Sequence, residues 1–305
     1  MTGYTNGNLH FISSMFVYKQ YDQTALDRQY NNRLQVPEFA IHLQRWEDTS
    51  STAKKKFNAV HDIAYGDDER ERLDIYPSST KNSKTLVFIH GGYWQKLDKS
   101  LFQFVAEGFL PYGFTVVLIT YPLAPSVPLD TIVASCKKAV RWVHDNIHQY
   151  NGDANELYVA GHSAGGHLAV MLNCAGQQQS PAALPAGTIK AVCAMSGLFD
   201  LEPIRLSEIN EVLKLDKQAV FNNSPVHLLP VCNCPLLVAV GADESDEFIA
   251  QSEALYFAWQ KHNVPMKLLR LPGINHYSIV ESFTDKQSSL HAAMLQLIAG
   301  LSQNG

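Results

Sequence analysis

Six short apolar runs, rich in β-branched residues, constrain the fold of this chain most. They are TLVFIH, FTVVLITY, ELYVAGH, IKAVCAMSG, PLLVAVGA and MKLLRLPG. A segment able to form a helix follows each of the first five, and strands that alternate with helices build a parallel sheet. The runs are apolar throughout rather than alternating, as expected for strands with helices on both faces. The sequence therefore predicts an α/β fold with a mostly parallel central sheet.

The pattern divides the chain into a leading segment and one main domain. Residues 1–58 are mostly polar and irregular, and we expect them to pack as an N-terminal extension on residues 59–305. HDIAYG and ERLDIYP, joined by a short turn, predict an antiparallel edge at the start of the sheet. Residues 199–233 form a cap-like insertion between two expected strands, and insertions there commonly shape an active-site entrance.

Composition and charge exclude several classes of protein. The 305 residues carry a net charge of -5, and the 24 Lys and Arg are scattered, so no basic face is offered to nucleic-acid phosphates. No apolar stretch approaches the ~18 residues that cross a bilayer, and the first residues lack a signal-peptide pattern. The five cysteines are odd in number and lie mostly in apolar segments, as in a reducing cytosol. We therefore expect a cytoplasmic protein that binds neither nucleic acid nor membrane.

Two pairs of residues have spacings found in parts of metal sites, His144 with His148 and Cys232 with Cys234. Neither pair has the further ligands that a zinc site needs. No glycine loop of the phosphate-binding or dinucleotide-binding type is present in the sequence. The sequence therefore predicts no metal and no cofactor.

A G-x-S-x-G motif, GHSAG at residues 161–165, lies between the expected strand ELYVA and an expected helix. The motif carries meaning only in this context of strand, sharp turn and helix. Its small residues allow a strained turn that lifts the serine hydroxyl out of the sheet edge, and the helix aims its first N–H groups at developing negative charge. Ser163 is therefore the predicted nucleophile, and the alternative is a serine that only caps the helix.

A His-Gly-Gly loop, HGGYW at residues 90–94, follows the run TLVFI. Glycines permit backbone conformations that expose N–H groups, which suits an oxyanion hole beside a nucleophile. The expected donors are the backbone N–H groups of Gly92 and Tyr93, completed by that of Ala164. His90 precedes the nucleophile in the chain, so we expect it to anchor the loop rather than to act as a base.

The general base is expected after the nucleophile in the chain. The histidines that follow Ser163 are His167, His227, His262, His276 and His291. His276 stands in the loop LPGINHYS directly after the last expected strand, which brings it to the same edge of the sheet as Ser163. We therefore predict that His276 takes the proton of the Ser163 hydroxyl and returns it to the leaving amine.

The loop GADESDEF after PLLVAV offers four carboxylates for the acid that orients the base. The acid usually lies two or three residues beyond the glycine that ends the strand, which leaves Asp243 and Glu244. Asp is the commoner residue in this role, whereas Glu244 has the more usual spacing. Asp246 and Glu247 are expected to cap the next helix, where carboxylates offset its dipole. The sequence leaves the choice between Asp243 and Glu244 open.

Together the motifs resemble the kynurenine formamidase (arylformamidase) branch of the α/β-hydrolase fold. The segments that carry the resemblance are DRQY, AYGDDERERLDIY, FIHGGYWQ, GHSAGGHLA, SGLFDLEP, NNSPV, GADESDEFIAQS and the late Asn-His pair. The resemblance implies a serine hydrolase that cleaves N-formyl-L-kynurenine to L-kynurenine and formate in tryptophan catabolism. It assigns Ser163 as nucleophile, His276 as base and position 243 or 244 as acid. The chain departs from the family there, because the family carries Asp where this chain has Glu244.

The substrate implied by this resemblance combines a small formyl group, an aryl ring and an amino-acid carboxylate. An apolar wall is expected around the ring, and its candidates are Tyr93, Trp94, Leu198, Phe199 and Tyr277. For each of them, packing in the core is an equal alternative. Arg205 and Asn222 are the candidates for contact with the carboxylate.

Two other functions are compatible with the same motifs. A general carboxylesterase of the His-Gly-Gly type would use the same machinery on esters. A non-enzymatic binding module is disfavoured, because such modules usually lack part of the catalytic triad. We expect a small-molecule substrate as the partner of this protein, and the sequence leaves a homodimer open.

Overall fold

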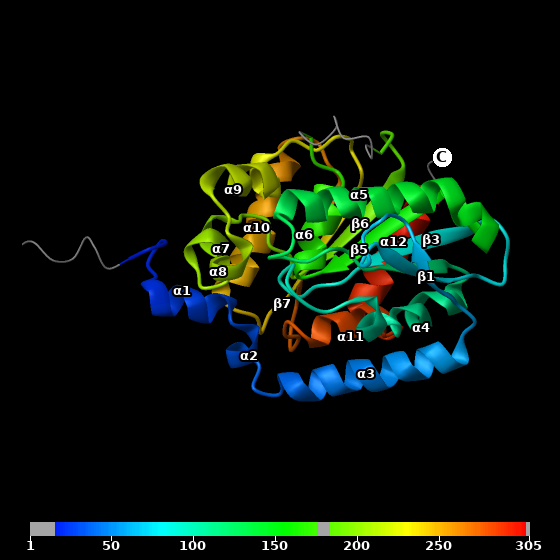
Figure 1. Ribbon diagram of the computed structural model, residues 1–305, viewed down its shortest axis with the longest axis horizontal. Coiled ribbons are helices and arrows are strands. Elements are labelled where there is room, and N and C mark those ends of the chain that lie inside the picture. Colours follow the sequence, from blue (N-terminus) through cyan, green and yellow to red (C-terminus); the bar gives the residue numbers. More distant parts are fainter. Residues whose placement is uncertain (1–15, 176–183, 303–305) are drawn as a thin grey trace, which may run out of the picture.

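The computed structural model describes residues 16–175 and 184–302. Its centre is an eight-stranded sheet, shown in Figure 1. The strands are β1 (Val60–Ala64), β2 (Arg72–Tyr76), β3 (Ser83–Ile89), β4 (Thr115–Ile119), β5 (Gly152–His162), β6 (Ile189–Met195), β7 (Leu236–Gly241) and β8 (Met266–Leu271). Their order across the sheet is β1-β2-β4-β3-β5-β6-β7-β8.

The direction of pairing changes once across the sheet. β1 pairs with β2, and β2 with β4, in antiparallel register, whereas all the following neighbours are parallel. This confirms the predicted α/β fold with a mostly parallel sheet and an antiparallel N-terminal edge. β3 pairs with β4 on one side and β5 on the other, and nearly all of its side chains are buried, which explains its uniformly apolar sequence.

Helices cover both faces of this sheet (Figure 1). They are α1 (Gln23–Tyr30), α2 (Asn32–Gln35), α3 (Phe39–Lys56), α4 (Val105–Phe109), α5 (Leu129–Asn146), α6 (Ala164–Met171), α7 (Glu202–Leu206), α8 (Asn210–Leu213), α9 (Lys217–Asn223), α10 (Asp246–Gln260), α11 (Ser278–Thr284) and α12 (Ser289–Ser302). Within the described ranges, no helix is both long enough and apolar enough to cross a membrane.

Side chains of the strands alternate between two hydrophobic cores. Val87 and Ile89 of β3 belong to the core that includes residues of α5, α6 and α10. Leu86 and Phe88 of the same strand belong to the core that includes residues of α4, α11 and α12. Because successive side chains of a strand point to opposite faces, this alternation produces the three-layer arrangement. Figure 1 shows α5 and α6 on one side of the sheet and α4 and α11 on the other.

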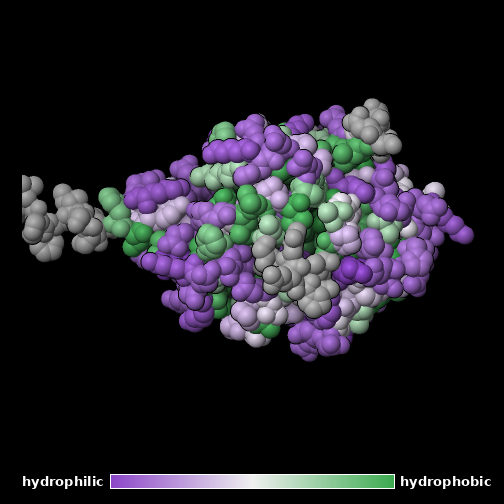
Figure 2. Space-filling view, turned by 90° about the horizontal axis from the view of Figure 1, so that it is seen from above, coloured by the Kyte–Doolittle hydropathy of each residue, from purple (hydrophilic) through white to green (hydrophobic). Residues whose placement is uncertain are grey.

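The N-terminal helices contribute to both cores. Tyr30 at the end of α1 is 1% exposed and lies in the first core, whereas Trp46 of α3 is 2% exposed and lies in the second. The division of the chain near residue 58 stays a prediction, although the helices before it pack on the sheet domain. On the face seen in Figure 2, hydrophilic residues cover most of the surface and hydrophobic ones gather toward its middle.

The carboxyl ends of four parallel strands meet at one edge of the sheet. β3 ends at Ile89, β5 at His162, β7 at Gly241 and β8 at Leu271. Directly after these ends come the segments with the predicted site residues: the His-Gly-Gly loop, the nucleophile, the acid loop and the base. The topology therefore brings together residues that lie up to 186 positions apart, from His90 to His276.

Candidate active site

Ser163 lies on the turn between β5 and α6 with φ 57° and ψ -122°, a strained conformation for a side chain other than glycine. The turn depends on Gly165, because a Cβ there would lie 2.0 Å from the carbonyl oxygen of Ile89. The backbone N–H of Ser163 donates to the carbonyl of Met195 on β6 at 2.8 Å. The hydroxyl is thus presented at the edge of the sheet, as the G-x-S-x-G motif predicts.

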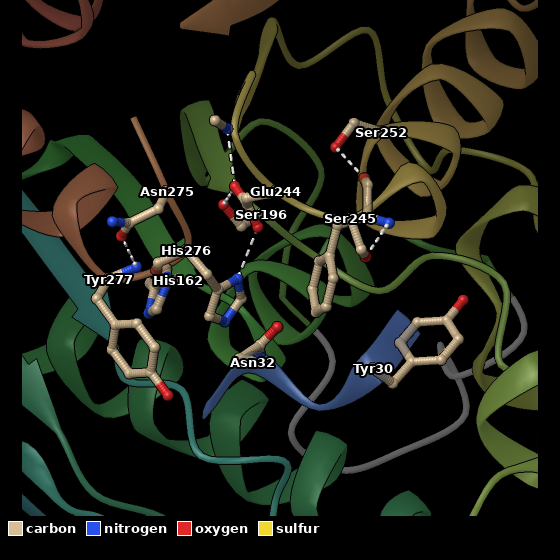
Figure 3. A network of polar contacts seen from close by, with 12 residues as sticks. Tyr30, Asn32, His162, Ser196, Glu244, Ser245, Ser252, Asn275, His276 and Tyr277 are labelled. Carbon is tan, nitrogen blue, oxygen red and sulfur yellow. Dashed lines mark hydrogen bonds and ion pairs between the residues drawn. The ribbon is translucent and has the colours of Figure 1, made fainter. Parts of the chain in front are cut away.

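The imidazole of His276 is held by a carboxylate. Its Nδ1 lies 2.7 Å from Oε2 of Glu244, and both side chains are buried. The other oxygen, Oε1, accepts from the backbone N–H of Gly241 at 2.7 Å and from Oγ of Ser196 at 2.5 Å (Figure 3). The carboxylate therefore has a partner on each oxygen and cannot turn away from the imidazole.

Asp243, the other candidate acid, is exposed, and its backbone N–H donates to the carbonyl of Ile274. Its side chain makes no hydrogen bond or ion pair within residues 16–175 and 184–302, whereas Glu244 contacts His276 directly. The structure thus distinguishes between Asp243 and Glu244, the two candidate acids between which the sequence did not decide. Of the two, Glu244 has the position that orients a general base.

The loop that carries His276 is fixed from two sides. Oδ1 of Asn275 accepts from the backbone N–H groups of Tyr277 and Ser278, each at 2.9 Å, which forms a tight turn before α11 (Figure 3). On the other side, Nε2 of His162 lies 2.8 Å from the carbonyl oxygen of His276. Burial lowers the pKa of His162 well below its ordinary value, so the ring is neutral and donates through Nε2–H. Nδ1 of His276 is engaged by Glu244, whereas Nε2 has no hydrogen-bond partner among the described residues.

The His-Gly-Gly loop has the backbone expected of an oxyanion hole. Gly92 has φ 112°, and Tyr93 and Trp94 also have positive φ values of 51° and 57°. The backbone N–H groups of Gly92, Tyr93 and Ala164 donate to no acceptor in the part of the chain that the structure describes. Three donors are therefore free at the edge of the sheet that carries Ser163.

His90, the first residue of this loop, is held by contacts in the core. Its ring is fully buried and stacks on Tyr121 with ring centroids 4.3 Å apart. Burial lowers its pKa to about 4, so the neutral ring donates from Nδ1 to the carbonyl of Gly91 at 2.7 Å. The hydroxyl of Tyr121 donates to the carbonyl of His90 at 2.8 Å. These contacts fit the expected anchoring role and give His90 no route to the nucleophile as a base.

Ser163 and His276 open onto one cavity of about 380 Å³, a volume within the range of small-molecule sites. Three other groups of residues form its walls. They are the N-terminal residues Tyr30, Asn31, Asn32, Arg33, Leu43 and Trp46, the loop residues Gly91, Gly92, Tyr93, Gln95, Lys96 and Leu97, and the insertion residues Glu208, Ile209, Glu211 and Val212, together with His162 and Tyr277. The last group falls within residues 199–233, the segment for which the sequence predicts an insertion.

Three of the five residues expected at the substrate wall lie elsewhere. Trp94 and Phe199 are both fully buried and are absent from the cavity lining. Trp94 packs edge-on against the ring of His167 with centroids 5.1 Å apart, and a Cβ at Gly197 would lie 2.2 Å from the ring of Phe199. Leu198, also considered for this wall, is fully buried too. Core packing therefore accounts for these side chains.

Tyr277 and Tyr93 do line the cavity, as expected. The side chains considered for the substrate carboxylate do not. Arg205 is paired with Glu202 at 2.7 Å, and Asn222 is exposed on α9 outside the lining.

Sequence reasoning missed the contribution of the N-terminal helices to the cavity. Leu43 and Trp46 are three residues apart on α3, a spacing that places them on one helix face, and both line the cavity. Sequence reasoning also missed the cations Arg33 and Lys96. Within the described residues, no three His, Cys, Asp or Glu side chains are grouped as a metal ion would require.

The sheet order, the position of Ser163 on a strand-to-helix turn and the His-Gly-Gly loop define the α/β-hydrolase fold. The BD-FAE family model matches residues 73–256 of the chain. A protein of known structure from Silicibacter sp. TM1040, described as a candidate thioesterase, is 28% identical with a TM-score of 0.77, covering 88% of this chain and 97% of that one. Esterase B from Lactobacillus rhamnosis has a TM-score of 0.68 at 19% identity, with 88% and 96% covered, and supports the fold alone.

Curated relatives narrow the assignment. Kynurenine formamidase from Danio rerio is 33% identical over 264 residues, which cover 84% of this chain and 88% of that protein. Kynurenine formamidase from Salmo salar is 31% identical over 295 residues, which cover 92% and 98%. The chain belongs to the kynurenine formamidase family, which confirms the resemblance found in the sequence.

Proposed function

We propose that this protein is a serine hydrolase that cleaves the formamide of N-formyl-L-kynurenine to L-kynurenine and formate, a step of tryptophan catabolism. Membership of the kynurenine formamidase family over nearly the whole chain carries the proposal. The arrangement of Ser163, His276 and Glu244 around one cavity supports it with a chemical rationale.

In the first half of the reaction, Oγ of Ser163 attacks the formyl carbon while Nε2 of His276 takes its proton. Glu244 accepts from Nδ1–H of His276 and stabilises the imidazolium that forms. The imidazolium then gives its proton to the aniline nitrogen, the C–N bond breaks, and kynurenine leaves. A formyl ester remains on Ser163.

The tetrahedral intermediate carries a negative charge on the former formyl oxygen. We assign its stabilisation to the backbone N–H groups of Gly92, Tyr93 and Ala164, which have no other acceptor among the described residues. The N-terminal end of α6 adds a favourable dipole at the same place. Because the formyl group is the smallest acyl group, the intermediate needs little room between Ser163 and the loop.

In the second half of the reaction, His276 removes a proton from a water molecule that attacks the formyl ester. The tetrahedral intermediate collapses, the proton returns to Oγ of Ser163, and formate leaves. The substrate suits this machinery. In a formanilide the nitrogen lone pair is shared with the aromatic ring, so the amide resonance is weaker and the amine leaves more readily than in a peptide.

The experiment that tests this proposal compares two substrates on the purified protein. We expect a higher kcat/KM for N-formyl-L-kynurenine than for p-nitrophenyl acetate, with Ser163→Ala as the control for background hydrolysis. A large preference for the ester would instead assign the protein as a general carboxylesterase of the His-Gly-Gly type.

We also propose a cytoplasmic location. The five cysteines are free thiols, and four of them are buried, as suits a protein that works in a reducing compartment. Fractionation of the native source, with immunodetection of the protein, tests this proposal; recovery in the secreted fraction would contradict it.

A further inference from the structure

Four charged side chains line the catalytic cavity without taking part in the proposed reaction. They are Arg33 on α2, Lys96 on the His-Gly-Gly loop, and Glu208 and Glu211 on the insertion. All four residues are exposed, and none of their side chains forms an ion pair within the ranges that the structure describes. Arg205, in contrast, is neutralised by Glu202 a few residues away. Unpaired charges at the rim of a substrate cavity are available to a charged ligand.

The two cations line the same cavity. Burial and the charge of Arg33 together lower the pKa of Lys96. The guanidinium of Arg33 also lies 5.2 Å from the ring centroid of Phe39, which holds it by a cation–π contact. Two neighbouring like charges repel, so an anion bound to both would relieve that repulsion as well as gain hydrogen bonds.

Glu208 and Glu211 are three residues apart, just before α8 and at its start, and the backbone N–H of Glu211 donates to the carbonyl of Glu208 at 3.1 Å. The segment between them contacts the chain just after the His-Gly-Gly loop, because Nε2 of Gln95 donates to the carbonyl of Ile209 at 3.2 Å. It is tied to α1 as well, because the backbone N–H of Glu208 donates to Oδ1 of Asp27 at 2.8 Å. The acidic pair is thus fixed relative to the loop that carries Lys96.

A cavity lined by two cations and two carboxylates is complementary to a ligand that has both a negatively and a positively charged group. A neutral ester or a simple formanilide has no group for either pair, whereas an α-amino acid has a carboxylate for the cations and an ammonium for the anions. We propose that Arg33 and Lys96 bind the α-carboxylate of the substrate and that Glu208 and Glu211 bind its α-ammonium. This inference rests on the proposed function and assigns the residues that select a formanilide bearing an amino acid.

The test uses two formanilides that differ only in the amino-acid group: N-formyl-L-kynurenine and 2′-formamidoacetophenone. For Arg33→Gln and Lys96→Gln, we expect kcat/KM to fall about tenfold or more for the first substrate, mainly through KM. For the neutral substrate it should stay within about twofold, because the reacting groups are untouched. Glu208→Gln and Glu211→Gln should show the same selectivity with smaller losses.

Arg28→Gln is the matched control, because Arg28 is an exposed cation on α1 outside the cavity lining. It should leave both substrates unaffected. Equal losses on the two substrates in the cavity variants, or no loss on either, would overturn the assignment. Thermal unfolding of each variant identifies any that fail to fold.

A second measurement separates this inference from the proposed function. L-Kynurenine should inhibit hydrolysis of p-nitrophenyl acetate by competition, and Arg33→Gln should raise its inhibition constant about tenfold. If N-formyl-L-kynurenine is not hydrolysed but L-kynurenine still inhibits in this residue-dependent way, the proposed function fails and the amino-acid site stands. If L-kynurenine does not inhibit the unmodified protein, the amino-acid site itself is contradicted.

Discussion

Glu244 and His276 are joined by a contact of 2.7 Å between Oε2 and Nδ1, across the loops that follow β7 and β8. The contact is buried, and the second carboxylate oxygen is held by Gly241 and Ser196. A carboxylate fixed in this way selects the imidazole tautomer with a proton on Nδ1 and stabilises the imidazolium. The exposed Asp243 has no such contact.

Replacing the two carboxylates singly tests this relationship. We expect Glu244→Gln to lower kcat by roughly 10³–10⁴, because an amide can present its NH2 to Nδ1 and hold the wrong tautomer. Asp243→Asn should change kcat by less than about twofold, because its side chain faces solvent. Steady-state kinetics on N-formyl-L-kynurenine provides the measurement. A large loss in Asp243→Asn with activity retained in Glu244→Gln would reverse the assignment.

Ser163→Ala should abolish turnover and leave the fold intact. The hydroxyl makes no hydrogen bond within the described residues, so its loss should change the free energy of unfolding by less than about 1 kcal/mol. Circular dichroism and thermal unfolding check the fold, and a sulfonyl fluoride should label the unmodified protein at Ser163 as shown by mass spectrometry of peptides. Labelling at another serine, or activity in the variant, would remove Ser163 from the role.

Local pattern and chain order are sufficient to propose Ser163 as nucleophile and His276 as base, and the structure places both on the same cavity. Ser163 follows a buried strand and begins a helix, and His276 stands in the loop after the last strand. Choosing the acid required three-dimensional contacts. Asp243 and Glu244 are neighbours, and the chain brings one of them to His276 only through the turn in which Gly241 N–H donates to Glu244.

The walls of the cavity were also harder to predict, because they too depend on three-dimensional contacts. Trp94 and Phe199 lie next to site motifs in the sequence, yet both side chains are buried in the core that includes residues of α5, α6 and α10. Trp46 and Arg33 are more than a hundred residues from Ser163 and reach the cavity only because α2 and α3 dock there. Periodicity predicts the apolar face of a helix, whereas docking depends on complementary shape that one sequence does not reveal.

Gly165→Ala should destabilise the protein and impair the oxyanion loop. A Cβ at this position would lie 2.0 Å from the carbonyl oxygen of Ile89 and 2.5 Å from that of His90, so α6 or the loop must move. We expect a loss of about 3 kcal/mol in the free energy of unfolding, together with reduced kcat.

The control for this variant is Gly300→Ala on α12, where a Cβ would meet no atom within 4 Å. That substitution should be neutral or stabilise the helix by up to about 1 kcal/mol. Chemical denaturation of both variants measures the difference. Equal stabilities would show that the contact between α6 and the end of β3 is looser than the structure indicates.

The buried His167 should make stability depend on pH. Burial lowers its pKa to about 4, so the neutral ring donates from Nε2 to the carbonyl of Asn223 at 2.7 Å. An unfolded histidine titrates near pH 6.5, so between about pH 6.5 and 4 the unfolded chain binds a proton that the folded chain does not. The contribution of His167 therefore lowers the free energy of unfolding as the pH falls through this window.

His167→Gln isolates this contribution, because the amide of Gln can donate to Asn223 but does not titrate. The slope of the unfolding free energy against pH should be smaller in the variant by about 1.4 kcal/mol per pH unit near pH 5. Urea denaturation across pH 4.5–8 measures both slopes, roughly the range in which the protonation of the unfolded histidine changes. Above about pH 7.5 the two curves should run parallel, since neither state binds the proton. Parallel curves below pH 6 as well would show that His167 takes up a proton in the folded protein.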